Sequence, residues 1–465
     1  MANAAGARFD VAQFVDERPI GAREIIMLVV CTLVLFIDGF DMYFLGKIAP
    51  AVAEGLGARP ADMAEVFTIQ QIGMAIGAFL MPPLADRIGR KPVLAMCMAV
   101  FGVLSIAAVF TPSLIALAVL RGISGIFFSA MLPIGLALLS EMTPRRMRAS
   151  FMAIALVGFS GGSAASGAVA AWLLDLYGWQ IGFWLGGLIP LLGLPLLLTI
   201  PESLAFRVAR NPLDPHIPDT IRRMGGGSAL LGEEEFHMGA APRRAEKNGP
   251  MALFGPRYRV QTIILWCACF LALGNIALLA SWMPTYFQEL GGIPIQEFAV
   301  SAMIAFAGGA AGTLTMGWLL DRVNPFWLIS GFFVIDAIAL ALLGVLPFGT
   351  GAFLIAMIVW NYCQVGGQTG LNTLATLGYP PQMRSSGIGW AGGAGRIGGI
   401  AFPYAGGLAL TMLVPLETIM FIVAVPAVLV AVLVFILGIS NRGQIAAAEP
   451  EDEEVAEIAG EPRPA

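Results

Sequence analysis

Long apolar stretches alternate with short polar segments over most of the chain. A helix needs about 20 apolar residues to cross the hydrocarbon core of a bilayer, and each of these stretches is long enough. The pattern therefore predicts twelve transmembrane helices, with ends placed to within a few residues. The predicted spans are 24–46, 62–83, 92–111, 113–140, 149–174, 181–200, 260–289, 297–320, 326–347, 351–377, 386–412 and 416–439.

The composition agrees with lipid as the surrounding solvent. Of the 465 residues, 58% are hydrophobic and only 12% are charged, and the mean hydropathy is +0.81. Soluble domains carry about 25% charged residues. The predicted fold class is an all-α membrane protein.

Three polar segments lie outside the spans. Residues 1–23 mix both charges and lack the pattern of a cleavable signal peptide. Residues 201–258 contain Gly225-Gly226-Gly227-Ser228 and clustered charges, which predicts a flexible cytoplasmic linker. Residues 440–465 form an acidic tail that we expect to be disordered. The two six-helix halves are then 24–200 and 259–439.

The two halves share an internal repeat. Asp86-Arg87 recurs 235 residues later as Asp321-Arg322, and Met147-Arg148 recurs 236 residues later as Met383-Arg384. Both copies occupy corresponding loops. Such a repeat predicts two halves in parallel orientation, related by an axis along the membrane normal, with a site between them.

Basic residues set the predicted orientation. If the amino terminus is cytoplasmic, the even-numbered loops hold nearly all Lys and Arg residues, whereas the odd-numbered loops hold only Lys47 and Arg59. Cytoplasmic loops carry the excess of basic residues in membrane proteins. The distribution predicts that both termini are cytoplasmic.

The histidines and cysteines argue against an enzyme. Both histidines, His216 and His237, lie in the predicted linker, and the five cysteines fall within spans without metal-ligand spacing. No nucleophile, metal cluster or phosphate loop stands out, so we expect no catalytic residues, no metal and no cofactor. A proton carrier inside the membrane would have to be a carboxylate.

Two such carboxylates, Asp38 and Asp41, lie in the first predicted span. Their spacing of three residues places them on one helical face. Acidic residues at membrane depth are costly, and they usually line a cavity, pair with a cation or carry protons. The alternative is a salt bridge that only fixes helices together.

Two arginines, Arg121 and Arg396, also fall within spans. A guanidinium can hold a carboxylate with two parallel hydrogen bonds, and the glycines around Arg396 leave room for a ligand. We therefore predict that Arg396 anchors a substrate carboxylate. The alternative is that Arg396 pairs with Asp336 or with backbone carbonyls.

The tenth span carries a stripe of amides that would be costly to expose to lipid. The stripe consists of Asn361, Gln364, Gln368 and Asn372. Aromatic side chains are candidates for contact with a ligand ring, although ordinary helix packing or interfacial anchoring explains each single one better. These aromatic candidates are Phe40, Tyr43 and Trp390, with Trp360 and Tyr362 nearby.

The loop after the second span reads Leu84-Ala85-Asp86-Arg87-Ile88-Gly89-Arg90-Lys91. It resembles the signature G-x-x-x-D-R-x-G-R-[RK] of the major facilitator superfamily, with Pro82 at the first Gly position. Glu141-Met142-Thr143-Pro144 with Arg148, and Pro201-Glu202-Ser203, resemble two further facilitator motifs. In the second half, Asn324 replaces the later Gly of the signature. The resemblance assigns gating to Asp86, Arg87, Arg90, Glu141, Arg148, Glu202, Asp321, Arg322 and Arg384.

Asp38-Gly39-Phe40-Asp41 in the first span resembles the aromatic acid:proton symporters, a facilitator family with carriers for 4-hydroxybenzoate and protocatechuate. Arg121 begins an R-x-x-x-G pattern that resembles the facilitator arginine facing an acid on helix 1, and this implies Asp41 as its partner. Proton coupling would then involve Asp38, Asp41 and Arg121. The fourth span departs from the family at residues 126–133, where bulky side chains replace glycines.

The resemblance implies a multi-pass protein of a bacterial inner membrane that imports a small aromatic carboxylate together with protons. The expected partners are this substrate, protons and the lipid bilayer, without nucleic acid, and the protein is expected to be a monomer. The alternatives are a porter of a sugar or aliphatic acid, a drug exporter or a membrane sensor. The fifth span lacks the G-x-x-x-G-P-x-x-G-G pattern of drug exporters, and the linker and tail are too short for a signalling domain.

Overall fold

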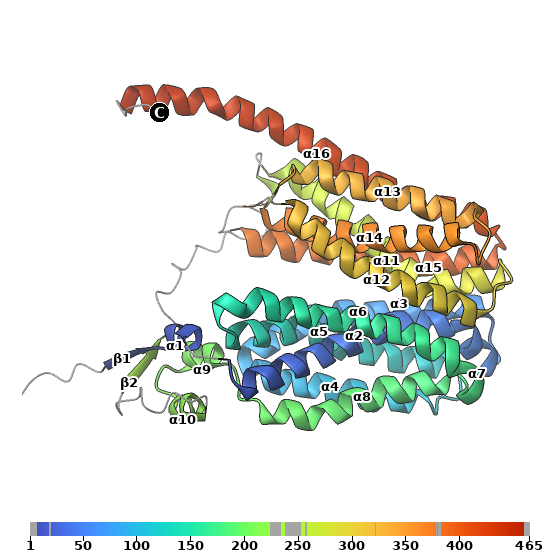
Figure 1. Ribbon diagram of the computed structural model, residues 1–465, viewed down its shortest axis with the longest axis horizontal. Helices are drawn as coiled ribbons and strands as arrows, with labels where there is room; N and C mark the ends of the chain where they lie inside the picture. The colour runs from blue at the N-terminus through green and yellow to red at the C-terminus, as the bar shows by residue number, and fades with distance from the viewer. Residues whose placement is uncertain are drawn as a thin grey trace, which may run out of the picture. The chain divides into compact units, whose positions relative to one another are not determined.

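The computed structural model describes residues 7–17, 20–223, 234–237, 253–255, 258–320, 322–377, 379 and 383–459. Figure 1 shows that long helices make up most of it. The chain forms two compact units. Unit 1 comprises residues 1–245, 277–307 and 399–416, and unit 2 comprises residues 246–276, 308–398 and 417–465.

Twelve long helices in the described part of the chain correspond to the twelve predicted spans, so the predicted twelve-helix membrane fold is confirmed. In the first half they are α2 (Ala22–Gly55), α3 (Met63–Ile88), α4 (Arg90–Ala108), α5 (Leu114–Met142), α6 (Arg145–Trp172) and α8 (Gln180–Thr199). In the second half they are α11 (Arg259–Glu289), α12 (Ile295–Leu320), α13 (Pro325–Val345), α14 (Gly351–Leu377), α15 (Arg384–Thr411) and α16 (Leu416–Ala459). Ten of them are long and apolar enough to cross a membrane, and α14 and α15 have similar lengths of 27 and 28 residues.

Two helix ends differ from the predictions. Helix α2 continues to Gly55, so Lys47 lies inside a helix and not in a loop. The apolar pattern goes on past residue 46, and Pro50 lies inside the helix without ending it. Helix α16 continues through the acidic tail to Ala459, where disorder was expected. The tail is rich in Ala and Glu, two good helix formers, and this local preference is the physical reason for the difference.

Small residues allow the helices of unit 1 to pack closely. Helix α2 lies along α6, and α3 lies along α5. At the α2–α6 crossing, a Cβ atom on Gly39 would come within 2.0 Å of the Phe159 carbonyl oxygen. A Cβ atom on Gly162 would come within 1.9 Å of the Phe36 carbonyl oxygen. Only glycine permits this separation of the two backbones.

Unit 1 also includes the ends of three second-half helices, α11, α12 and α15. The Trp282 ring of α11 packs edge-on against Phe67 of α3, with ring centroids 5.2 Å apart, and its Nε1–H donates to the Pro403 carbonyl of α15 at 2.7 Å. Phe306 of α12 packs edge-on against Tyr43 of α2 at 4.7 Å. The units therefore do not follow the predicted boundaries of the six-helix halves.

The amino-terminal segment and part of the predicted linker fold together at one end of unit 1 (Figure 1). We call this group the amino-terminal cap. It consists of β1 (Ala7–Asp10), α1 (Val11–Glu17), α9 (Leu204–Arg210), α10 (His216–Arg223) and β2 (Glu234–His237). The two strands pair in parallel, with Ala7 opposite Glu234. A small core holds the cap together, formed by Val11, Val15, Leu204, Val208, Ile217, Ile221 and Phe236.

The expectation of a flexible linker is thus wrong for residues 204–223 and 234–237. Apolar residues in this segment recur at positions that bury one face of α9 and of α10, but their partners come from the first 17 residues of the chain. The sequence pattern of the linker alone could not reveal partners so distant. The short α7 (Leu174–Tyr177) and η1 (Pro60–Asp62) lie at the end of unit 1 away from the cap.

Candidate functional site

A buried ion pair joins α2 to α5 inside unit 1. The Arg121 guanidinium donates through Nη1 to Asp41 Oδ1 at 2.9 Å and through Nη2 to Asp41 Oδ2 at 2.5 Å. The side chains of Arg121 and Asp41 are 1% and 8% exposed. This parallel geometry is the strongest form of a charge-assisted hydrogen bond. The predicted pairing of Asp41 with Arg121 is therefore present, whereas its role in proton coupling stays a prediction.

Further groups hold the guanidinium in place. Gln70 of α3 accepts a third hydrogen bond, from Arg121 Nε, at 3.2 Å. The Phe183 ring of α8 lies under the guanidinium, 5.8 Å from its carbon. Four helices thus converge on Arg121. Asp38 lies one turn before Asp41 on α2 and is also buried.

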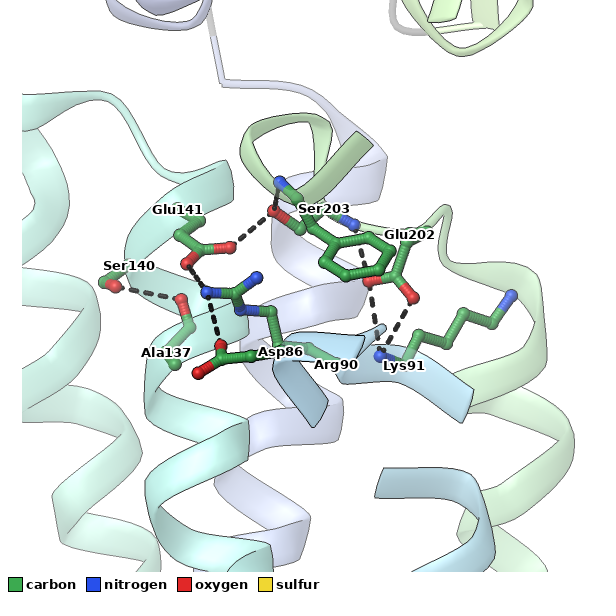
Figure 2. Close-up of polar contacts among 9 residues, drawn as sticks. Asp86, Arg90, Lys91, Ala137, Ser140, Glu141, Glu202 and Ser203 are labelled. Carbon is green, nitrogen blue, oxygen red and sulfur yellow. Dashed lines mark hydrogen bonds and ion pairs between the residues drawn. The ribbon is translucent and has the colours of Figure 1, made fainter. Parts of the chain in front are cut away.

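A second polar cluster lies at the cap end of unit 1, and Figure 2 shows its contacts. Arg90, the first residue of α4, lies 2.9 Å from a carboxylate oxygen of Glu141 on α5 and 3.5 Å from Asp86 on α3. The Ser203 hydroxyl donates to the other Glu141 oxygen. We call Asp86, Arg90, Glu141, Glu202 and Ser203 the loop network.

Glu202 caps the start of α4 within this network. Both of its carboxylate oxygens accept from the Lys91 backbone N–H at 3.3 Å, and Oε1 also accepts from the Ser203 N–H at 2.8 Å. Gly89 makes the turn between α3 and α4 with φ of +119°. A Cβ atom on Gly89 would lie 2.2 Å from Glu202 Oε2, so both the turn and the carboxylate require glycine here.

The remaining predicted gating residues are less connected. Arg87 is exposed, and Arg148 donates to the Thr143 carbonyl oxygen at 3.5 Å. In the second half, Arg322 stacks on the Trp318 ring with its guanidinium carbon 4.0 Å from the centroid. Asp321 lies outside the described residues, and Arg384 is the first residue of α15, with its side chain outside the described part.

A cavity of about 660 Å³ lies between the cap and the ends of α4 and α8. Basic and acidic side chains line it together, including Lys91, Arg207, Glu202 and Asp214. Burial raises the pKa of Asp214, but a hydrogen bond from the His216 backbone N–H and the Arg207 guanidinium at 3.2 Å outweigh that effect. The pKa of this carboxyl therefore lies below its usual value. The balanced charges favour no particular ligand.

The second-half candidates belong to unit 2. Arg396 is half-buried on α15 between Gly395 and Gly398, both of which pack closely against α11. The amide stripe lies on α14, where Asn361 and Gln364 are buried. Gln368 Nε2 donates to Asn372 Oδ1 at 3.0 Å.

Asn361 faces α12, because a Cβ atom on Gly309 would lie 2.4 Å from its Oδ1. Among the described residues, neither Asn361 Oδ1 nor Gln368 Oε1 has a hydrogen-bond partner, although both atoms are buried. Buried amides without partners are costly, so the stripe retains hydrogen-bonding capacity for another molecule.

The aromatic candidates occupy different surroundings. Phe40 is buried and stacks on Phe44, with ring centroids 5.0 Å apart. Trp390 is 47% exposed and stacks on Trp266 at 5.6 Å. Tyr43 packs against Phe306 and lies close to Lys47. Tyr43 thus lies next to a buried cation, whereas Phe40 and Trp390 pack mainly on other rings.

Sequence reasoning missed Gln70 and Lys47, and it named Ser203 only as part of the Pro201-Glu202-Ser203 motif. Gln70 and Ser203 complete the Arg121 and Glu141 sites, but a single polar side chain of this kind carries no signal of its own. Lys47 does carry one, since its place in an apolar stretch that continues beyond residue 46 indicates a buried cation.

Comparison with known proteins identifies the family. The family model of the Major Facilitator Superfamily matches residues 31–403. The chain is 34% identical over 426 residues to a gallate transporter of Pseudomonas putida, covering 90% of this chain and 93% of the relative. It is 31% identical over 449 residues to a 4-hydroxybenzoate transporter of the same species, covering 95% and 98%.

A solved structure supports the fold. The D-xylose-proton symporter aligns with a TM-score of 0.68 at 15% identity, over 89% of this chain and 98% of that one. At this identity the likeness concerns the fold alone. With the family match over most of its length, the chain belongs to the major facilitator superfamily of membrane transporters.

Proposed function

We propose that this protein is a proton-coupled importer of small aromatic carboxylates that works by alternating access. The relatives with 31% and 34% identity are named as transporters of 4-hydroxybenzoate and gallate, which are both benzoates with ring hydroxyls. These relatives support the substrate class. The Asp41–Arg121 pair is the observation that carries the coupling mechanism.

The pair suits reversible protonation for an electrostatic reason. While Arg121 contacts both Asp41 oxygens, the guanidinium favours the charged carboxylate. If Arg121 moves away, the buried carboxylate loses its counter-charge and the neutral form becomes favourable. A movement that separates α2 from α5 would therefore bind a proton, and its reversal would release it. Asp38, one turn away on the same face, would assist.

Substrate recognition is assigned to unit 2. Arg396 would hold the carboxylate with two parallel hydrogen bonds. The amide oxygens of Asn361 and Gln368, which have no partner among the described residues, would accept from ring hydroxyls. The loop network would hold the cytoplasmic side shut in one state of the cycle. The cytoplasmic position of the loop network follows from the predicted orientation, in which both termini lie in the cytoplasm.

Uptake into proteoliposomes tests the proposal. Counterflow should occur with benzoates that carry ring hydroxyls, and neither sugars nor aliphatic dicarboxylates should exchange. Arg396→Lys should raise KM for the acid about tenfold or more, because Lys cannot make the bidentate contact. Wild-type exchange of a sugar in place of benzoates would contradict the substrate class. An unchanged KM in Arg396→Lys would exclude Arg396 as the anchor.

A further inference from the structure

A second cavity opens in unit 1, at the end away from the cap. We call it the distal cavity. It has a volume of about 480 Å³, and its lining comes from α2, α7 and the neighbouring ends of α11 and α12. Its lining includes Lys47, Glu54, Asp175, Trp179, Gln288 and Gln296. A cavity of this size is large enough for a benzene ring with its substituents.

Lys47 lines this cavity as a buried cation. The residue is 2% exposed, and its Nζ donates to the Tyr43 carbonyl oxygen at 3.2 Å and to Ser166 Oγ at 2.7 Å. The ammonium also lies 5.2 Å from the Phe306 ring centroid and 5.5 Å from that of Tyr43. Among the described residues, no carboxylate pairs with it.

This environment leaves the charge of Lys47 without compensation. An ammonium has three donors, and in the part of the chain that the structure describes two oxygen atoms accept hydrogen bonds from it. The two rings attract the cation through their faces, but they do not neutralise it. Arg121 differs from Lys47 in this respect, because its Nη2 donates to the Asp41 carboxylate at 2.5 Å. A buried cation without a counter-ion is costly unless an anion comes from outside.

The rest of the distal cavity offers a partner for a ring hydroxyl of such an acid, while Lys47 would take its carboxylate. Gln288 Oε1 is buried and has no hydrogen-bond partner in the described part of the chain, so it can accept from an O–H group. Two carboxylates stand at the exposed rim. Gln296 Nε2 donates to one of them, Asp175, at 2.6 Å, and the other is Glu54.

We propose that Lys47 binds the carboxylate of the incoming aromatic acid in the distal cavity, as a binding residue separate from Arg396. The proposal rests on the proposed function and adds a second anion site to it. In this conformation Phe306 of α12 covers the ammonium. Withdrawal of α12 from α2 would uncover Lys47 on the side away from the cap, which is where an imported substrate would arrive.

The test compares Lys47→Met with Lys47→Arg in proteoliposomes that take up labelled 4-hydroxybenzoate. Met keeps the length of the side chain without its charge. We expect Lys47→Met to raise KM about tenfold, which corresponds to ~1.4 kcal/mol, with a smaller effect on Vmax, while Lys47→Arg stays near wild type. Ser166→Ala is the matched control, because it removes a partner of Nζ but keeps the cation.

A second variant applies if Lys47→Met does not fold. Glu54 is exposed at the rim of the cavity, so Glu54→Gln should not disturb folding. Removal of its negative charge should lower KM about twofold if the cavity attracts anions, and high salt should abolish the difference. An unchanged or raised KM in Glu54→Gln contradicts the proposal.

The other outcomes are equally informative. A KM of Lys47→Met within twofold of wild type overturns the anion site. Loss of gradient-driven accumulation with an unchanged counterflow KM would make Lys47 a proton carrier, which also overturns it. If the wild type takes up no aromatic acid, the proposed function itself fails, and this is seen before any variant is measured.

Discussion

Two groups of ion pairs in unit 1 differ in how they hold their charges. The Asp41–Arg121 pair is a one-to-one contact of buried charges, with side chains 8% and 1% exposed. In the loop network, Arg90 divides its charge between Glu141 and Asp86, whose side chains are 21% and 70% exposed. One group is a single bidentate contact in the membrane interior, and the other is a set of partial contacts at a helix end.

The two groups should therefore respond differently when one charge is lost, either by protonation or by substitution. In the buried pair each charge depends on one counter-charge, so loss of either leaves a charge in a medium that solvates it poorly. In the loop network water and other partners replace a lost contact, as for most exposed ion pairs. We therefore propose that the buried pair acts as a switch, whereas the network would adjust the stability of one conformation in small steps.

Asp41→Asn should have the largest effect. Asn cannot carry a proton and leaves Arg121 uncompensated, so accumulation driven by a pH gradient should fall to the background level. The variant should also lose ~3–5 kcal/mol of stability, because one partner of a buried pair is gone. Accumulation in proteoliposomes and thermal unfolding in detergent measure the two effects.

The double variant Asp41→Asn with Arg121→Gln is the control. With both charges removed, stability should recover in large part, whereas accumulation should stay absent. Normal accumulation by Asp41→Asn would remove Asp41 from the coupling mechanism. Failure of the double variant to recover stability would mean that the pair is not the source of the loss.

Gly89→Ala should have an intermediate effect on the loop network. Ala would have to adopt φ of +119°, and its Cβ would collide with Glu202 Oε2. We expect a loss of ~1–3 kcal/mol from the strained backbone and the displaced carboxylate. Thermal unfolding measures it.

Gly57 provides the matched control for this prediction. It also has a positive φ, +67°, but a Cβ atom there would meet nothing within 4 Å. Gly57→Ala should therefore lose only the stability that the strained backbone removes. Equal losses of stability in Gly89→Ala and Gly57→Ala would show that the collision with Glu202 does not contribute to the loss.

The sequence predicted helix positions and individual ion pairs better than the larger assemblies. Apolar length alone located the twelve spans, because the bilayer sets that length directly. The Asp41–Arg121 pair was predictable for two reasons. A charged side chain within a span is costly without a partner, and in the family that the sequence resembles an arginine of this pattern faces an acid on helix 1. Both signals are local and strong.

The amino-terminal cap and the distal cavity were not predictable in this way. The cap depends on Phe236 and Val11 meeting across more than 200 residues of chain, which no periodicity indicates. The distal cavity depends on where α2 ends and on which side chain of α12 covers Lys47. Such contacts arise from tertiary packing, so they become visible only in the folded chain.

Glu141→Gln should have the smallest effect of these three substitutions. Gln keeps the size of the side chain and can still accept from the Ser203 hydroxyl, and Arg90 retains Asp86 as a counter-charge. We expect the rate of uptake to change less than tenfold and stability by about 1 kcal/mol or less. Asp86→Asn, at the longer distance of 3.5 Å and with greater exposure, should change both still less. A loss of accumulation as complete as that of Asp41→Asn would mean that Glu141 carries charge in the transport cycle, and the contrast between the switch and the network would no longer hold.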